Sequence, residues 1–427
     1  MSDTILILSQ VYPPDPASVG QHMHDVAAEL VKRGHRVKVI TADRGYDDPT
    51  IRYERYEKRD GVDVHRVRWS SFGKKSIPIR ATAMLIFMLH CIWAGLTTRG
   101  LKKILVSTSP PMCGFAAGLA HSLRGVPITY WVMDLNPDQM IELGKMRADS
   151  LAARVLNALQ RFVLRRSAEI VPLDRFMAER LYKKLSPAEA ERVRARVTIM
   201  PPWPHEEALD DIPHEKNWFR EKHGLNGKFV FMYSGNHGYS TPVTTLLQAG
   251  LKMDGEKAAG DAGTLLMFIG GGVGKKEVDQ TIKEKSPGNI RSMPYQPFKD
   301  LAFSLSAADV HLVTVGNDVV GVVHPCKIYG AMAVGRPILL VAPDPCHASD
   351  IIKDHGVGWH IKHGDVEGAV KTLREIAALP PERLQEMGRR AKAYIDQQMS
   401  KSALCGAFCT IVEAGITAET RGARRDA

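Results

Sequence analysis

The chain has 427 residues, of which 44% are hydrophobic and 24% are charged, and its formal net charge is +10. This composition excludes disordered and fibrous proteins, and the length predicts two domains because one hydrophobic core rarely serves so many residues. The basic excess lies in one half, since residues 1–200 hold 31 Lys and Arg against 20 Asp and Glu, whereas the rest hold 26 against 27.

A basic half favours a phosphate-rich partner, such as nucleic acid, anionic lipid or a lipid-linked phosphate. A surface tuned only for solubility is the alternative interpretation. The six cysteines form no CxxC pair, which predicts reduced thiols and a cytoplasmic protein. At the N-terminus, MSDTILILSQ has an acid at position 3 and an apolar run too short for a signal peptide.

Short apolar strands alternate with helical stretches through the first half of the chain. The first strand, at 4–9, leads through a loop into a helix over 21–34. Buried strands separated by helices predict a parallel sheet that is covered on both faces. The further strands expected in this half are 35–41, 62–69, 103–108, 127–133 and 169–173.

Residues 79–103 contain a long apolar segment. Their apolar core, 81–96, is shorter than the roughly 20 residues that span a bilayer. The stretch therefore predicts a buried helix of the first domain. A helix lying in the membrane interface is the alternative, because basic residues flank it: Lys74, Lys75, Arg80, Arg99, Lys102 and Lys103.

The alternation restarts after a segment rich in Pro and acidic residues, which predicts a linker over 201–227. Helices expected at 241–253 and 298–309 separate some of the later strands. The strands expected in the second half are 228–236, 264–272, 289–296, 308–315, 336–343 and 356–362.

The predicted fold class is therefore α/β, with two Rossmann-like, doubly wound domains in tandem. We expect an N-terminal domain over 1–200, a C-terminal domain over 228–390, and a helical tail over 391–427 that packs back on the first domain. In such sheets ligands bind beyond the carboxyl ends of the strands, so a site is expected in the cleft between two facing domains.

The glycine-rich stretch at 270–274 matches neither the dinucleotide fingerprint nor the P-loop, because Lys275 and Lys276 occupy positions that those motifs reserve for other residues. This argues against NAD binding and ATP hydrolysis. A glycine does follow the first strand of each half, Gly20 and Gly235. Without a Cβ the main-chain amides can approach an anion closely, so the pair predicts a shared diphosphate; simple structural turns are the alternative.

HPCKIYGAMAVGRPILLVAP at 324–343 holds a further candidate. His324 and Cys326 have no additional ligands at usable spacing, so no metal site is predicted. A thiol nucleophile at Cys326 needs a base and an electropositive setting, which the sequence leaves open. Lys327 stands in the first turn of a short helix, where its charge adds to the helix dipole and predicts a phosphate clamp.

Together these stretches resemble the retaining nucleotide-sugar glycosyltransferases of family 4, whose GT-B fold has two facing Rossmann-like domains. The resemblance spans nearly the whole chain, and two stretches, YWVMDLNPD and CKIYGAMAVGRP, are similar to the bacterial subgroup that builds O-antigen and exopolysaccharide units on a lipid carrier. The other stretches that show the resemblance are YPPDPASVGQHMHDVAAELVKRGHRVKVIT, VFMYSGNHG, FIGGG and GVGWHIKHGD.

The resemblance implies a UDP- or GDP-linked sugar donor bound by the C-terminal domain and a saccharide acceptor held by the N-terminal domain. It further implies retention at the anomeric carbon, with no cofactor and no obligatory metal. Lys327 and Asp134 are the expected catalytic residues. The expected donor-binding residues are Gly20, Gly235, Asn236, His237, Gly270, Gly271, Gly272, Tyr295, Asp318, His324, Cys326 and Ile328.

The chain departs from the family pattern at several positions. Two glutamates that many members carry are replaced by Val322 and Gly330, and Asp318 is the candidate substitute. Asp134 stands where many members have a histidine; its carboxylate can take a proton or orient the acceptor hydroxyl, or it can merely cap a turn. The basic residues that commonly follow the second glycine loop are absent, which leaves Lys327 and His237 to neutralise the diphosphate.

The resulting hypothesis is front-face sugar transfer in cell-surface polysaccharide or lipopolysaccharide biosynthesis. The acceptor is expected to be carried on a polyprenyl phosphate, and no nucleic acid is expected as a partner. The protein is expected in the cytoplasm, and peripheral contact with the anionic inner face of the plasma membrane is an open alternative. Two alternatives remain: a sugar-nucleotide 2-epimerase, which converts the donor without an acceptor, and an inactive sugar-nucleotide-binding protein.

Overall fold

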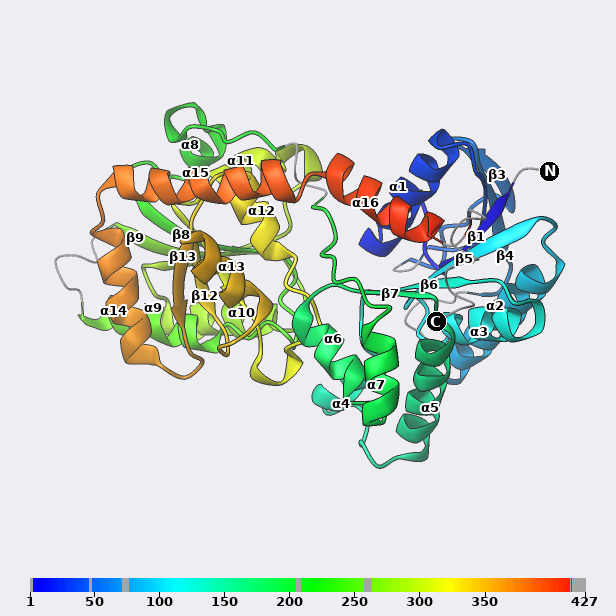
Figure 1. The fold of residues 1–427 in the computed structure, drawn as a ribbon. Helices are drawn as coiled ribbons and strands as arrows, with labels where there is room; N and C mark the ends of the chain where they lie inside the picture. The colour runs from blue at the N-terminus through cyan, green and yellow to red at the C-terminus, as the bar shows by residue number, and fades with distance from the viewer. Residues whose placement is uncertain are drawn as a thin grey trace. The chain divides into compact units, whose positions relative to one another are not determined.

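The computed structural model describes residues 3–45, 48–70, 77–204, 209–256, 263–414 and 416. The chain divides into two compact units, one formed by 1–203 with 402–427 and the other by 204–401. Each unit contains one sheet with helices around it (Figure 1). The predicted α/β class with two Rossmann-like units is confirmed.

The first unit is built on a seven-stranded sheet in the order β3-β4-β2-β1-β5-β6-β7. The central strand β1 pairs in parallel with β2 on one side and β5 on the other, so the loops after β1 and β5 lie at the topological switch point. The strands are β1 Thr4–Leu8, β2 Arg36–Ala42, β3 Tyr56–Arg59, β4 Val62–Val67, β5 Leu101–Ser107, β6 Ile128–Val132 and β7 Glu169–Pro172.

All six strands predicted in this half are present, and one strand was missed. The missed strand, β3, runs antiparallel to β4 at the edge of the sheet. Its sequence, YEKR, alternates between exposed and half-buried positions and carries no buried apolar residue. A strand without an apolar face has no hydrophobic pattern by which it can be predicted.

Eight helices of the first unit lie within the described part of the chain. The C-terminal helix α16 belongs here because Phe408 packs on Trp131 with 4.1 Å between ring centroids and Arg33 Nη1 donates to Glu413 Oε2 at 2.9 Å. No helix among the described residues has the length and hydropathy of a membrane span. The helices are α1 Ser18–Lys32, α2 Ile77–Thr97, α3 Cys113–Arg124, α4 Asp138–Glu142, α5 Leu151–Arg166, α6 Arg175–Tyr182, α7 Pro187–Arg194 and α16 Lys401–Glu413.

The second unit is built on a six-stranded sheet, entirely parallel, in the order β10-β9-β8-β11-β12-β13. Residues alternate between two hydrophobic clusters along β8: Phe231 and Tyr233 join one, Val230 and Met232 the other. The sheet is therefore buried on both faces, as predicted. The strands are β8 Phe229–Ser234, β9 Thr264–Ile269, β10 Ile290–Met293, β11 Val310–Thr314, β12 Ile338–Val341 and β13 Gly358–Ile361.

The helices of the second unit connect these strands and cover the sheet (Figure 1). As in the first unit, the strand order reverses beside the first strand, here between β8 and β11, which places the loops after these strands at the switch point. The longer helices are α9 Thr244–Glu256, α10 Lys275–Lys285, α13 His347–His355, α14 Val366–Ala377 and α15 Pro381–Gln398. The shorter ones are η1 His214–Lys216, α8 Trp218–Lys222, η3 Phe298–Asp300, α11 Leu301–Ser306, η4 Asn317–Val319 and α12 Lys327–Ala333.

The domain boundaries differ from the predicted ones at two places. The predicted end of the second domain, residue 390, falls inside α15, which packs on α12 and α13 and so belongs to the second unit. The predicted linker, 201–227, contains η1 and α8, and these also belong to the second unit. Within the predicted linker and tail, residues 205–208, 415 and 417–427 lie outside the described residues.

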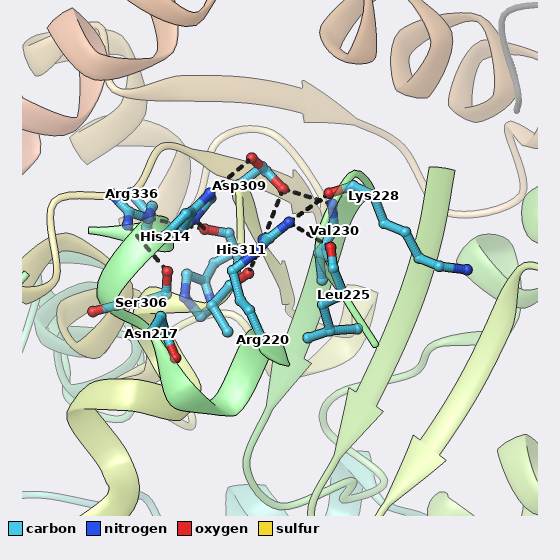
Figure 2. A network of polar contacts seen from close by, with 12 residues as sticks. His214, Asn217, Arg220, Leu225, Lys228, Val230, Ser306, Asp309, His311 and Arg336 are labelled. Carbon is cyan, nitrogen blue, oxygen red and sulfur yellow. Dashed lines mark hydrogen bonds and ion pairs between the residues drawn. The ribbon is translucent and has the colours of Figure 1, made fainter. Parts of the chain in front are cut away.

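A buried polar network explains why α8 is part of this unit (Figure 2). Arg220 is only 3% exposed, and its guanidinium donates to the carbonyls of Ala307 at 2.6 Å and of Leu225 and Lys228 at 2.7 Å. It also lies 3.5 Å from Asp309, whose carboxylate accepts from Val230 N at 2.7 Å. A buried guanidinium is tolerated because its donors are satisfied in this way.

We predict that Arg220→Met lowers the free energy of unfolding by about 3–5 kcal/mol, because Asp309 loses its counter-charge and three carbonyl oxygens lose the guanidinium donor. Denaturant titration followed by circular dichroism measures the change. Arg389→Met, at an exposed position on α15, is the matched control and should leave the denaturant midpoint of unfolding unchanged. Equal midpoints for the two variants would show that the network does not hold the unit together.

Candidate functional site

Two glycine loops of the second unit meet main chain to main chain, beyond the carboxyl ends of β8 and β9. Gly235 and Gly270 both have positive φ, +131° and +133°, and a Cβ at Gly270 would lie 1.9 Å from the Gly235 carbonyl oxygen. His237 N donates to Gly271 O at 2.7 Å, and Gly274 N donates to His237 O at 2.8 Å. Only glycine permits this approach, so the predicted loops form one main-chain surface.

Asn236 and Tyr295 complete this surface. A Cβ at Gly272 would lie 2.3 Å from Asn236 Oδ1, and one at Gly271 would lie 3.0 Å from the Tyr295 ring. The Tyr295 side chain is 58% exposed, so its ring covers Gly271 while keeping an open face. An exposed aromatic face beside glycine main chain is suited to stacking a planar group such as a nucleobase.

Lys327 lies directly over the first glycine. Its Cε would be 2.7 Å from a Cβ at Gly235, and its Nζ donates to Asn236 O and to the Tyr233 hydroxyl, 4.5 Å above the Tyr233 ring centroid. Burial lowers the pKa of Lys327 to about 7. No carboxylate among the described residues forms an ion pair with it. The ammonium thus has neutral partners only, and an anion would stabilise its charged form.

A second lysine lies beneath the same loops. Lys275 begins α10, is 8% exposed, and donates to the carbonyls of Phe268 and Met293, at the ends of β9 and β10. Burial lowers its pKa as well. Lys275 was not predicted as a site residue, although it follows the glycine run directly. A lysine in that place, at the start of a helix, is the signal that could have identified it.

His237 does not supply the positive charge expected of it. The ring is fully buried, 4.4 Å from the Tyr233 ring centroid, and neither ring nitrogen has a hydrogen-bond partner. Burial, followed by the nearby Lys275 and Lys327, lowers its pKa to about 4. His237 is therefore neutral near pH 7, and this part of the prediction is wrong because the sequence did not reveal that the ring points into the core.

The other residues predicted around Lys327 have separate environments. His324 Nε2 lies 2.7 Å from the Tyr329 hydroxyl, which lies 2.9 Å from His347 Nε2, so His324 helps to hold the segment that leads into α12. Cys326 is exposed just before Lys327, and Asp318 is exposed on η4.

Ile328 is the clear exception among the predicted donor-binding residues. Its side chain is fully buried, and its N–H donates to Pro325 O at 3.3 Å. Both its side chain and its amide are occupied within the protein, which argues against a contact of the Ile328 side chain with the donor.

In the first unit, Gly20 lies in the first turn of α1. A Cβ there would lie 3.0 Å from both Tyr12 N and Val11 C, which are main-chain atoms of the loop after β1. The glycine therefore allows α1 to pack on the loop at the switch point. Close packing explains this glycine structurally, and its contact with a donor phosphate stays a prediction.

Asp134 follows β6 in the first unit and lines a narrow pocket between α3 and α5. Its N–H donates to Thr108 Oγ1 at 3.0 Å, and burial raises the pKa of its carboxyl to about 6. The carboxylate thus exists mainly as the charged form above about pH 6, within a pocket whose other lining includes Phe115, Leu159 and Gln160. Asp134 and the glycine loops belong to different units of the chain.

Comparison with known proteins adds to this geometry. Residues 18–202 match the family model described as "Glycosyl transferase 4-like domain", and residues 215–394 match "Glycosyl transferases group 1". The probable glycosyltransferase WbjE of Pseudomonas aeruginosa is 26% identical over 93% of this chain and 94% of its own. The candidate colanic acid biosynthesis glycosyl transferase WcaI of Escherichia coli (strain K12) is 22% identical over 88% of this chain and 92% of its own.

Solved structures agree on the fold. WaaG, a glycosyltransferase involved in lipopolysaccharide biosynthesis, superimposes with a TM-score of 0.67 at 16% identity, over 96% of this chain and 100% of its own. Anabaena HepE in complex with UDP gives a TM-score of 0.68 at 12% identity, over 97% of this chain and 100% of its own. Two glycosyltransferase domains in succession account for most of the sequence, and the chain belongs to the family 4 glycosyltransferases with the GT-B fold.

Proposed function

We propose that this glycosyltransferase moves a sugar from a UDP- or GDP-linked donor to a saccharide on a polyprenyl phosphate, with retention at the anomeric carbon, in the synthesis of a cell-surface polysaccharide. The observation that carries the proposal is the uncompensated ammonium of Lys327 on the joined glycine loops. The similarity to HepE, which was solved with UDP and with UDP and glucose, supports the choice of donor. WaaG and WcaI, named for lipopolysaccharide and colanic acid biosynthesis, support the choice of product.

The second unit binds the donor in this proposal. Main-chain amides of the glycine loops receive the diphosphate, and the open face of Tyr295 stacks on the base. Lys327 turns from Asn236 O toward the diphosphate, whose charge raises the lysine pKa and keeps it an ammonium. As the bond from the anomeric carbon to the phosphate oxygen breaks, the ammonium stabilises the growing negative charge. Protein cations thus neutralise the leaving group, and no metal ion or cofactor enters the proposal.

The first unit binds the acceptor. The acceptor hydroxyl attacks the anomeric carbon on the face from which the nucleoside diphosphate departs, and its proton passes to an oxygen of the leaving phosphate. Asp134, ionised above about pH 6, accepts a hydrogen bond from an acceptor hydroxyl and orients the sugar.

We predict that Lys327→Met lowers turnover by about a hundredfold, because the stem still packs on Gly235 while the charge is lost. Release of UDP or GDP is measured with a panel of UDP- and GDP-sugars, saccharides on synthetic polyprenyl phosphates, and EDTA. Lys276→Met is the matched control, because Lys276 is an exposed lysine in the first turn of α10. Unchanged turnover in a folded Lys327→Met protein contradicts the role of the lysine.

The same assay tests the reaction type. An epimerised donor formed without acceptor would identify a 2-epimerase, and a strict need for added metal would contradict the metal-free reaction.

The pH dependence gives an independent prediction. The pKa of Lys327 is about 7 in the free protein, so the ammonium fraction falls as the pH rises through that value. Because kcat/KM reports the free enzyme, it should fall on the alkaline side of about pH 7, whereas the fall in kcat should occur at higher pH once bound diphosphate stabilises the ammonium. Identical alkaline limbs in both profiles would mean that Lys327 does not meet the diphosphate.

We also propose that α2 of the first unit rests on the anionic membrane surface that carries such an acceptor. Leu85, Leu89, Trp93 and Leu96 follow one face of this helix and are 50%, 55%, 63% and 36% exposed. The helix contains no acidic residue, and the exposed Arg99 follows it. An apolar stripe on a basic unit complements an anionic bilayer.

Of the basic residues expected to flank this helix, one is buried in the first unit and two lie outside the described residues. Lys103 is fully buried and donates to Ala414 O at 2.8 Å, so it holds the end of α16 rather than facing lipid. Lys74 and Lys75 lie outside the described residues.

We predict that the wild-type protein floats with liposomes containing phosphatidylglycerol at low salt and that Leu89→Ser/Trp93→Ser abolishes flotation, because the stripe loses its largest apolar side chains. Phe298→Ser, a 72% exposed position of the second unit, is the control and should float as wild type does. Absence of wild-type binding at low salt would overturn the membrane contact. A concentration-dependent dimer that the double variant loses, seen by sedimentation, would instead identify a second copy as the occupant of α2.

A further inference from the structure

The pocket beside Asp134 combines apolar walls with two polar side chains that can still form hydrogen bonds to a ligand. It is formed at the carboxyl ends of β5 and β6 and by the facing sides of α3 and α5. Phe115, Leu159 and Val163 supply apolar surface, and Gln160 and Thr108 supply polar atoms. The enclosed space is narrow, with room for about one water-sized group such as a methyl.

Gln160 presents an acceptor without a donor. Its side chain is 7% exposed, and its Oε1 has no hydrogen-bond partner among the described residues. The side-chain amide contacts the hydroxyl of Tyr130, which lowers the pKa of that phenol against the larger rise that burial causes. Oε1 is thus a buried acceptor without a donor. A buried unpaired oxygen costs free energy that a ligand N–H or O–H can recover.

Thr108 presents the complementary donor. Its Oγ1 accepts from Met133 N at 3.2 Å and from Asp134 N at 3.0 Å. With these two bonds accepted, the hydroxyl hydrogen can be donated to a ligand. One acceptor, one donor and three apolar side chains therefore line a space for a small group.

We propose that this pocket binds the acetamido group of an N-acetylated acceptor sugar. The methyl fills the enclosed space between Phe115, Leu159 and Val163, and the amide lies at the mouth of the pocket, with its N–H as the donor for Gln160 Oε1 and its carbonyl beside Thr108. A hydroxyl at the same carbon would satisfy Gln160 but leave the apolar walls unfilled. The proposal rests on the proposed function in one respect, that the ligand of the first unit is a saccharide acceptor.

The test compares methyl 2-acetamido-2-deoxyglycosides with the matching methyl glycosides, in both the gluco and the galacto series, by titration calorimetry. The wild-type protein should bind the acetamido sugar of at least one series about tenfold more tightly than its 2-hydroxy partner, the gain expected from one hydrogen bond and a buried methyl. This comparison needs no variant. Equal affinities within both pairs overturn the proposal.

Variants locate the preference in this pocket. Gln160→Leu should reduce the ratio of the two affinities to about one, and Leu159→Phe, which fills the space, should do the same by a different route. Gln139→Leu on α4 is the matched control and should keep the wild-type ratio. Melting temperatures identify a variant that fails to fold. If Gln160→Leu fails to fold, the Leu159→Phe variant and the wild-type comparison still test the proposal. A preference that survives both pocket variants overturns the assignment.

The outcome can be separated from that of the proposed function. Thermal stabilisation of the protein by UDP or GDP reports the donor site in the second unit, independently of the acceptor. Nucleotide binding without acetamido preference overturns the pocket assignment alone. Absence of both overturns the proposed function as well.

Discussion

The contact of Gly235 with Gly270 is the constraint on which the candidate donor site depends. Two strand-end loops approach until main chain touches main chain, and a single methyl group on Gly270 would lie 1.9 Å from a carbonyl oxygen. This approach lets Lys327 lie across Gly235 and reach Asn236 O, so the position of the ammonium follows from the missing Cβ atoms. The loops follow neighbouring strands at the edge where parallel sheets bind ligands.

The cations in the interior of the second unit differ in what surrounds them. This difference distinguishes a cation with a structural role from the cations at the candidate site. Arg220 has three carbonyl acceptors and the Asp309 carboxylate, so its charge is balanced within the protein. Lys327 has a carbonyl, a phenol and a ring, and Lys275 has two carbonyls. Burial lowers the pKa of both lysines, and for Lys275 it outweighs the opposing charge of Asp279; such a cost is characteristic of sites that receive an anion.

The first unit shows the opposite electrostatics. Asp134 is half-buried with no cation to lower its pKa, and it shares its pocket with the unpaired oxygen of Gln160. A pocket that offers acceptors suits a ligand rich in O–H and N–H donors, as a sugar is. Lysines beside the glycine loops of one unit suit an anionic donor, and oxygen acceptors in the pocket of the other suit a neutral saccharide, the two substrates of the proposed reaction.

The sequence by itself determined the two sheets, twelve of their thirteen strands and the glycine loops, because apolar runs and glycines act locally along the chain. It also predicted Lys327 as a site residue, since this lysine begins a helix of small residues, α12, after the switch-point strand β11. Only the tertiary structure decided which polar side chains face a ligand. His237 and Ile328 stand beside site residues in sequence but point into the core, whereas Tyr233, Lys275 and Gln160, which were not predicted as site residues, reach the sites. Burial and hydrogen bonding arise from contacts between distant segments, which local sequence patterns do not encode.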